Sequence, residues 1–186
     1  MIDPTLKRSL GQMIKGVQVV GACHGGEARA YTSHWVTQIA FDEPIVLASV
    51  SPKHDTYPLM VKSGFFGVSI LAADQIMEGQ YFSYPGRKFN CVGEEMLEVD
   101  PNWGLPVVPN SIAYLRCETF DRIERFDHDL FLARVIGVRE GRLGEPPLLY
   151  SARHGWRKTG DNAREKGVSI RDQLLERVNE AGSDSD

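Results

Sequence analysis

The sequence predicts a mainly β protein with flanking helices. Two segments, residues 44–50 and 65–71, are rich in apolar and β-branched residues and lack helical spacing, so each predicts a largely buried strand. Two longer segments, 111–126 and 129–140, lie on either side of a short polar break, and apolar and polar residues alternate in 113–118. These longer segments predict a hairpin of two long strands.

The N-terminal residues predict a short helix followed by a hairpin. Asp3 and Pro4 suit a helix cap and first turn, and apolar residues recur at four-residue steps until Gly16. A strand over residues 17–20, a Gly25-Gly26 turn and a second strand that carries polar residues follow.

Two more helices and a long loop are expected in the middle of the chain. Residues 56–63 read as a helix that Gly64 ends, and residues 72–83 read as another. Glycine and proline punctuate residues 84–110, which predicts an extended loop with at most one short element.

The C-terminal part of the chain is expected to add one strand and one helix. Residues 148–150 are expected to close the sheet, before a basic run over 153–158. A weak apolar stripe over 163–178 predicts a helix, and the last residues are expected to fray. We therefore expect one domain over residues 1–160 and a C-terminal helix and tail over 161–186.

Composition indicates an ordinary soluble globular protein. Of 186 residues, 42% are apolar and 25% charged, and the net charge of −4 offers nucleic acid no general attraction. Three cysteines without a Cys-x-x-Cys pair predict free thiols in a reducing cytoplasm and no metal site. No segment resembles a signal peptide or approaches the ~18 apolar residues of a membrane span, so no membrane association is expected.

Two polar clusters lie on either side of the predicted strand over residues 44–50, and they can meet in space. Both are rich in hydroxyl groups, and the second adds a lysine; together they comprise Thr32, Ser33, His34, Thr37 and Gln38, then Ser49, Ser51, Lys53, His54 and Thr56. Hydroxyls and a fixed cation suit a phosphorylated, hydroxyl-bearing cofactor.

Several motifs follow one another in a fixed order along the chain. They are Tyr31-Thr32-Ser33-His34-Trp35-Val36-Thr37-Gln38-Ile39-Ala40, Glu43-Pro44-Ile45-Val46-Leu47-Ala48-Ser49-Val50, Ser63-Gly64-Phe65-Phe66-Gly67-Val68-Ser69-Ile70-Leu71, Asp74-Gln75, Phe82-Ser83, Arg87-Lys88-Phe89 and Asp127-His128-Asp129-Leu130-Phe131-Leu132-Ala133-Arg134-Val135. In this ordered series the chain resembles the flavin reductase-like family over roughly residues 16–156.

The resemblance implies a fold, a ligand set and an activity. The fold would be a six-stranded Greek-key split barrel that binds flavin mononucleotide (FMN), with FAD also possible as the flavin. The activity would be NAD(P)H-dependent flavin reduction in a homodimer, with reduced flavin or electrons passed to a monooxygenase or another acceptor.

The resemblance also assigns site residues. A cofactor-binding set is expected at Thr32, Ser33, His34, Trp35, Val36, Thr37, Ser49, Val50, Ser51, Lys53, His54, Thr56, Phe82, Ser83, Arg87, Lys88 and Phe89. His128 stands at the family's Gly-Asp-His motif on the nicotinamide side and is the candidate catalytic residue, although Phe126 replaces the motif glycine. At His34 and Trp35 relatives commonly carry small residues.

Other interpretations stay open at this level. Lys53 and Thr56 could form a solvated loop and a helix cap, Trp35 could pack in a core or a dimer contact, and His128 could be a plain turn residue. The chain could be a flavin-binding electron-transfer or storage protein without NAD(P)H turnover, or a split-barrel relative that binds heme or pyridoxal phosphate. Dinucleotide-loop, Walker, zinc-protease and hydrolase motifs are absent from the sequence.

Overall fold

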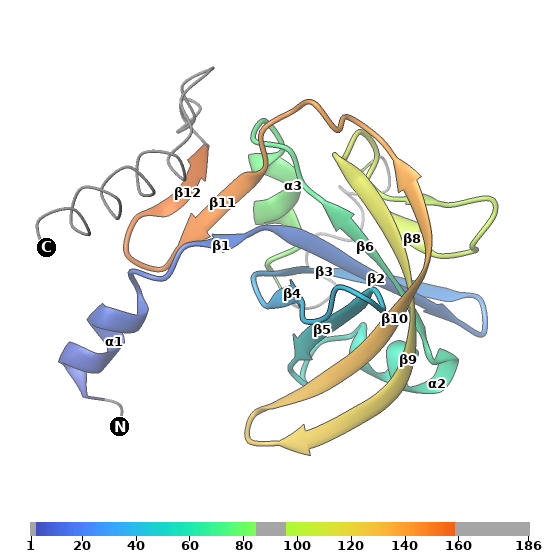
Figure 1. Ribbon diagram of the computed structural model, residues 1–186, viewed down its shortest axis with the longest axis horizontal. Coiled ribbons are helices and arrows are strands. Elements are labelled where there is room, and N and C mark those ends of the chain that lie inside the picture. The colour runs from blue at the N-terminus through green and yellow to red at the C-terminus, as the bar shows by residue number, and fades with distance from the viewer. Residues whose placement is uncertain (1–2, 85–95, 159–186) are drawn as a thin grey trace, which may run out of the picture.

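The computed structural model describes residues 3–84 and 96–158, and its largest element is a curled antiparallel sheet (Figure 1). The spatial order of its seven strands is β3-β2-β6-β9-β10-β5-β4. The strands are β2 (Gln18–His24), β3 (Glu27–Ser33), β4 (Val36–Gln38), β5 (Ile45–Val50), β6 (Phe65–Ile70), β9 (Ala113–Arg125) and β10 (His128–Glu140). The mainly β prediction is confirmed, with seven strands in this sheet instead of six because the short β4 pairs with β5.

Two smaller sheets lie beside the large one. The first contains β1 (Lys15–Gly16), β11 (Leu148–Ser151) and β12 (Gly155–Lys158), and the second contains β7 (Glu98–Val99) and β8 (Pro106–Val107). The expectation that residues 148–150 close the main sheet is therefore wrong, because β11 pairs on both sides with other short strands, one of which lies in the basic run. The described part of the expected loop over 84–110, residues 96–110, contains the two short strands β7 and β8, where at most one short element was expected.

Within the described residues, three short helices flank the sheets: α1 (Pro4–Leu10), α2 (Tyr57–Ser63) and α3 (Ile76–Tyr81). The predicted α2 is confirmed, including its end at Gly64, which takes the left-handed conformation with φ 73°. The N-terminal helix ends earlier than predicted, because Lys15 and Gly16 pair with β11 instead. The helix predicted over 72–83 is also shorter, since residues 72–75 form a turn in which the Gln75 side chain accepts from the Ala72 amide.

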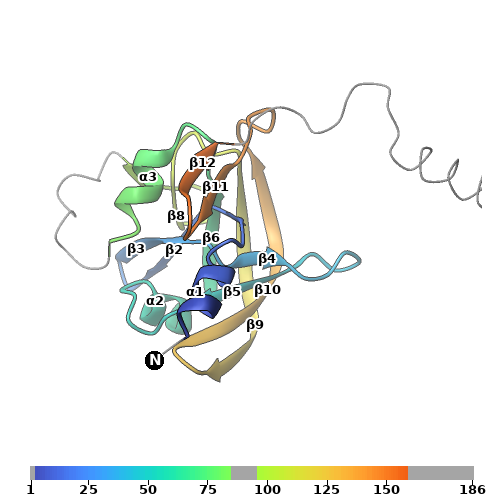
Figure 2. The ribbon, with the colours of Figure 1, turned by 90° about the vertical axis from the view of Figure 1, so that its left-hand side faces the viewer.

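The long hairpin is confirmed almost to the residue. Arg125 pairs with His128, so Phe126 and Asp127 alone form the turn. Figure 2 shows this hairpin along one side of the molecule and α3 on the opposite side. Phe126 has a φ of 58°. Glycine adopts positive φ values without a steric penalty, whereas a bulky residue such as phenylalanine is strained there.

The two larger buried clusters among the described residues hold the sheets and helices together. One lies between the curled sheet and α2 and includes Met60, Phe66 and Phe131. The other joins the start of β2 to β11 and includes Val17 and Leu148, against which Trp156 packs. Strand β3 contributes to both clusters, since Tyr31 belongs to the first and Ala30 packs on the second. The end of β3 is therefore held between them.

The predicted C-terminal helix and tail, residues 161–186, lie outside the described residues. None of the helices over 3–84 and 96–158 is long and apolar enough to cross a membrane.

Candidate flavin site

A pocket of about 130 Å³ opens where β3, β5 and β10 come together. Its walls come from the end of β3 and the two residues after it, from Ser49 on β5, from the loop after β5, and from the first residue of β10. The lining residues are Tyr31, Thr32, Ser33, His34, Trp35, Ser49, His54 and His128. All but Tyr31 belong to the predicted site.

Strand pairing explains why residues so far apart in sequence meet here. β5 pairs with β10, so that Val50 lies opposite Asp129 and Ser49 opposite Leu130. The backbone of Ser49 also donates to the carbonyl of Trp35 at 3.0 Å. The two polar clusters that flank β5 therefore meet, as predicted, and β10 adds His128 beside them.

Aromatic contacts fix the histidines of the pocket. The His54 ring stacks on Tyr31 with centroids 4.5 Å apart, and the His128 ring lies edge-on to Trp35 at 4.9 Å. Burial and the neighbouring His128 lower the pKa of His54, against the opposing charge of Asp55. His54 is therefore easier to keep neutral than an exposed imidazole, and an anion in the pocket would favour its protonation.

The ring of His128 is paired with the turn that precedes it. Its Nδ1 lies 3.1 Å from Asp127 Oδ1, an exposed carboxylate whose pKa is lowered by that contact. The hairpin turn therefore orients the imidazole.

His34 lines the pocket, and its ring contacts two aromatic side chains of the small β1-β11-β12 sheet. Its ring stacks on Tyr150 at 4.2 Å with 8° between the planes, and lies edge-on to Trp156 at 5.7 Å. Burial, with a smaller contribution from the charge of Lys15, lowers the pKa of His34 to about 4. Its Nδ1 is buried without a hydrogen-bond partner. The next residue, Trp35, is 49% exposed at the pocket edge, so it is the aromatic ring that a flat ligand could meet.

The hydroxyl groups of the pocket differ in what they can still offer. Thr32 Oγ1 donates to the carbonyl of Gly79 at 2.7 Å, which leaves its lone pairs as acceptors. Ser33 Oγ accepts from the amide of Trp35 at 3.1 Å and is buried, so its own hydrogen remains for another acceptor. The pocket therefore offers both hydrogen-bond donors and acceptors, which suits the edge of a ligand ring that carries both.

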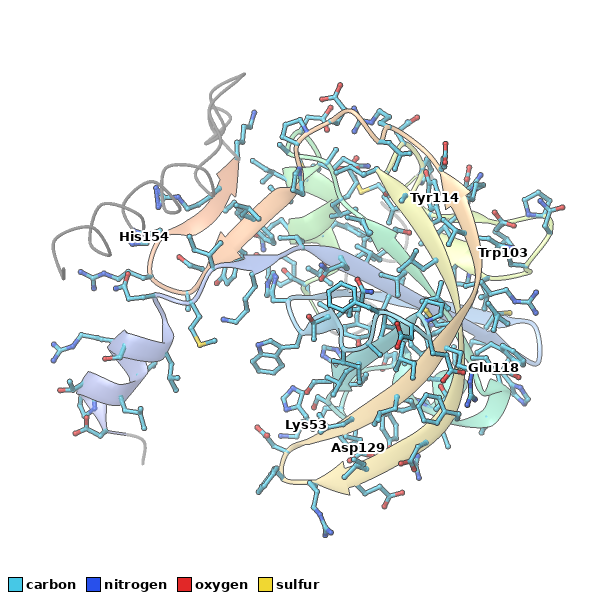
Figure 3. All side chains as sticks on the ribbon, in the orientation of Figure 1. Lys53, Trp103, Tyr114, Glu118, Asp129 and His154 are labelled. Atoms are coloured by element: carbon cyan, nitrogen blue, oxygen red, sulfur yellow. The ribbon has the colours of Figure 1, made fainter. Side chains whose placement is uncertain are left out.

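Several predicted site residues lie outside the pocket lining. Ser51 is half-buried, Lys53 is exposed, and both belong to the loop after β5. Figure 3 shows Lys53 near the turn of the β9–β10 hairpin, with Asp129 close by. Thr56 is buried but makes no side-chain hydrogen bond that would cap α2.

The remaining predicted residues are in strands or in the core. Val36 and Thr37 are on β4, where Val36 packs against the first buried cluster and Thr37 is exposed. Val50 and Phe82 are core side chains, so a ligand could meet these two residues through their backbone alone.

Ser83 is tied to α3 by hydrogen bonds with Gln80. Arg87, Lys88 and Phe89 lie outside the described residues.

Sequence reasoning missed Tyr31 as part of the pocket. Its position two residues before Ser33 on a strand is the signal that could have found it, because alternate residues of a strand share a face. Burial raises the pKa of the Tyr31 hydroxyl, which stays protonated. Within residues 3–84 and 96–158, no group of three His, Cys, Asp or Glu side chains is arranged to hold a metal ion.

Comparisons with known proteins agree with the sequence motifs. The family model described as a flavin reductase like domain matches residues 10–156. The reductase component of a 4-nitrophenol 4-monooxygenase/4-nitrocatechol 2-monooxygenase from Rhodococcus opacus is 30% identical over 165 residues, which span 83% of this chain and 86% of that protein. The NADH-dependent flavin reductase StyB from Pseudomonas fluorescens is 28% identical over 157 residues, spanning 82% and 89%.

A solved structure shares the fold. The NADH:FAD oxidoreductase SgcE6 of Streptomyces globisporus, in complex with NAD and FAD fragments, superposes with a TM-score of 0.76. At 24% identity the match covers 88% of this chain and 99% of that one.

Proposed function

The chain belongs to the flavin reductase-like family, and on that premise we propose that it transfers a hydride from NADH to a flavin and passes the reduced flavin, or its electrons, to a monooxygenase or another acceptor. The observation that carries this proposal is the pocket itself, which lies within the family-matching region and is lined by seven of the residues that the resemblance assigns to the site. The names of the relatives give support to a reductase and none to a flavin carrier without NADH turnover.

The pocket residues fit one end of a flavin. Their donors and acceptors suit the polar edge of the flavin ring, and the exposed ring of Trp35 offers a flat apolar surface beside them. A bound flavin supplies the hydride acceptor, so the chain has to bind, orient and shield rather than react covalently. Within that scheme His128 lies on the nicotinamide side, where its ring can contact the dinucleotide.

We propose FMN as the preferred flavin, with FAD as an alternative. Lys53 and Ser51 lie in the loop after β5, beside His54, so a terminal phosphate could meet a cation, a hydroxyl and an imidazole together. A relative from Streptomyces globisporus is named an NADH-dependent FAD reductase, which supports FAD as the alternative flavin. Arg87, Lys88 and Phe89 are proposed as further flavin contacts.

We also propose that the active form is a homodimer located in the cytoplasm. About 130 Å³ is well below the ~300–1,000 Å³ of pockets that enclose a drug-sized ligand, so the described residues of one chain enclose only part of a flavin, and a second copy would cover more of it. Apolar side chains stand exposed near the pocket and on the outer face of β10: Trp35, Phe126, Ile136 and Val138. Light scattering at low micromolar concentration tests the dimer, and a strictly monomeric flavin-loaded protein would contradict it.

Anaerobic mixing with NADH tests the reductase proposal. The purified protein is first loaded with FMN, FAD or riboflavin, and its visible spectrum separates flavin binding from binding of heme or pyridoxal phosphate. NADH, and in parallel NADPH, should then bleach the oxidised flavin absorbance in a stopped-flow spectrophotometer. A protein that binds flavin but is bleached by neither nucleotide would be a carrier, and a protein that binds no flavin would refute the proposal.

A further inference from the structure

Three side chains form a directed hydrogen-bond chain that links the start of α2 to the β9–β10 hairpin. Arg122 Nη1 on β9 donates to Tyr57 Oη at 3.1 Å, and Tyr57 Oη donates to Asp129 Oδ2 at 2.5 Å. The direction is fixed, because a tyrosine hydroxyl has one hydrogen and an ionised carboxylate can only accept. The bond to Asp129 is the first cause of the raised pKa of Tyr57.

The carboxylate at the end of this chain is buried. Asp129 is 7% exposed, and a buried charge without partners is costly. The Tyr57 hydroxyl supplies a short bond of the kind that an ionised acceptor makes. Arg122 supplies the positive charge at the other end and also pairs with Glu124. The Tyr57 ring packs edge-on against Phe131, so its hydroxyl is held in place.

Asp129 anchors both ends of the loop that carries Ser51, Lys53 and His54. At the start of the loop, Val50 pairs with the backbone of Asp129 in the sheet. The loop then runs through two turns, in which the amide of His54 donates to the carbonyl of Ser51 and the amide of Tyr57 donates to the carbonyl of His54, both at 3.0 Å. At its end, Tyr57 returns to Asp129 through its side chain.

We propose that Tyr57 and Asp129 are positioning residues, supported by the hydrogen bond from Arg122 to Tyr57. They hold the 51–56 loop in the position from which it can bind the phosphate of the flavin. His128, which lines the pocket together with His54, directly precedes Asp129, so the same anchor sets the spacing between the loop and the start of β10. The inference rests on the proposed flavin reductase function. It adds that Tyr57, Asp129 and Arg122 determine the preference of the site for FMN over riboflavin, which lacks the phosphate.

The test is the ratio of affinities for FMN and riboflavin, measured by calorimetric titration. Tyr57→Phe removes one hydroxyl and keeps the ring on Phe131, and Asp129→Asn keeps the acceptor shape but removes the charge. Each should lower the preference for FMN over riboflavin by about fivefold or more, the factor that one ordinary hydrogen bond represents. The affinity for riboflavin should change little.

Tyr114→Phe is the matched control. The hydroxyl of Tyr114 accepts from the amide of Ser111 at 3.0 Å, and Tyr114 is buried. It lies near the start of β9 (Figure 3), whereas Arg122 lies near the end of that strand. Removal of the Tyr114 hydroxyl should lower the melting temperature to a similar extent and leave the FMN preference unchanged. Circular dichroism would verify that all three variants fold.

The outcomes separate the inference from the function on which it rests. If Tyr57→Phe loses thermal stability like Tyr114→Phe but keeps the full FMN preference, the chain is merely structural and the inference is overturned. Equal affinity of the parent protein for FMN and riboflavin would also overturn it, while NADH-dependent bleaching would leave the reductase proposal intact. Failure of the parent to bind any flavin would remove both.

Discussion

Replacing Phe126 by glycine should stabilise the folded protein. Phe126 is the first of the two residues in the β9–β10 turn, and its φ is 58° while that of Asp127 is not positive. A positive φ at the first central residue is the pattern of a type II′ turn, in which glycine is favoured at that position. The side chain is fully exposed at 101%, so the protein gains no burial from it in return for the strain.

The expected gain follows from two opposing contributions. A left-handed conformation costs a residue with a Cβ atom about 1–2 kcal/mol, and glycine would relieve this. Glycine also loses more conformational freedom on folding, which costs about 0.5–1 kcal/mol. With the middle of each range, the net increase in the free energy of unfolding should be about 0.75 kcal/mol, which corresponds to a rise of about 1.5–3 °C in the melting temperature for a chain of this size.

Chemical denaturation and thermal melts measure this change, with Asn110→Gly as the matched control. Asn110 has the same φ of 58° and is also exposed, but asparagine tolerates the left-handed region. The control should therefore change stability by between zero and a loss of about 0.5 kcal/mol. A Phe126→Gly variant no more stable than the parent, or an Asn110→Gly variant that gains as much, would refute the strain argument.

Three further predictions concern the site. Lys53→Ala should weaken FMN binding by about 1.5–3 kcal/mol, roughly ten- to more than a hundredfold, with riboflavin binding nearly unchanged in calorimetry; equal losses for both ligands would make Lys53 a structural residue. His128→Ala should slow NADH-dependent bleaching, or raise the NADH concentration that it needs, with FMN affinity nearly intact in stopped-flow and binding assays; unchanged kinetics would make His128 a turn residue. Because the folded pKa of His34 is about 4 and its ordinary value is 6.5, the unfolded chain binds more protons between these pH values. The free energy of unfolding should therefore fall as the pH drops through that window, by about 1–2 kcal/mol after allowance for partial solvent exposure, and denaturation of His34→Gln at pH 7 and pH 5 should show a flatter dependence.

Local chemistry made the main elements and half of the site predictable. Three local signals each act within a few residues: the β-branched run of β5, the alternation along β9 and the glycine that ends α2. These elements could therefore be predicted without knowledge of the segments that pack against them. The two polar clusters around β5 were expected to meet because a single strand separates them, and the backbone bond from Ser49 to Trp35 shows that they do.

The remaining strands and side-chain contacts were decided by pairing between distant segments. Such pairing depends on strand register and on which sheet edges are free to pair. Lys15 and Gly16 leave the predicted helix to pair with β11, although their own sequence favours neither state. The ring of His34 stacks on Tyr150, which lies 116 residues further along the chain, a contact that the sequence around His34 did not indicate. The bond from Tyr57 to Asp129 spans 72 residues and exists because β5 and β10 are neighbours in the sheet. Such contacts carry no local signal, since neither residue changes the backbone preference of its own segment.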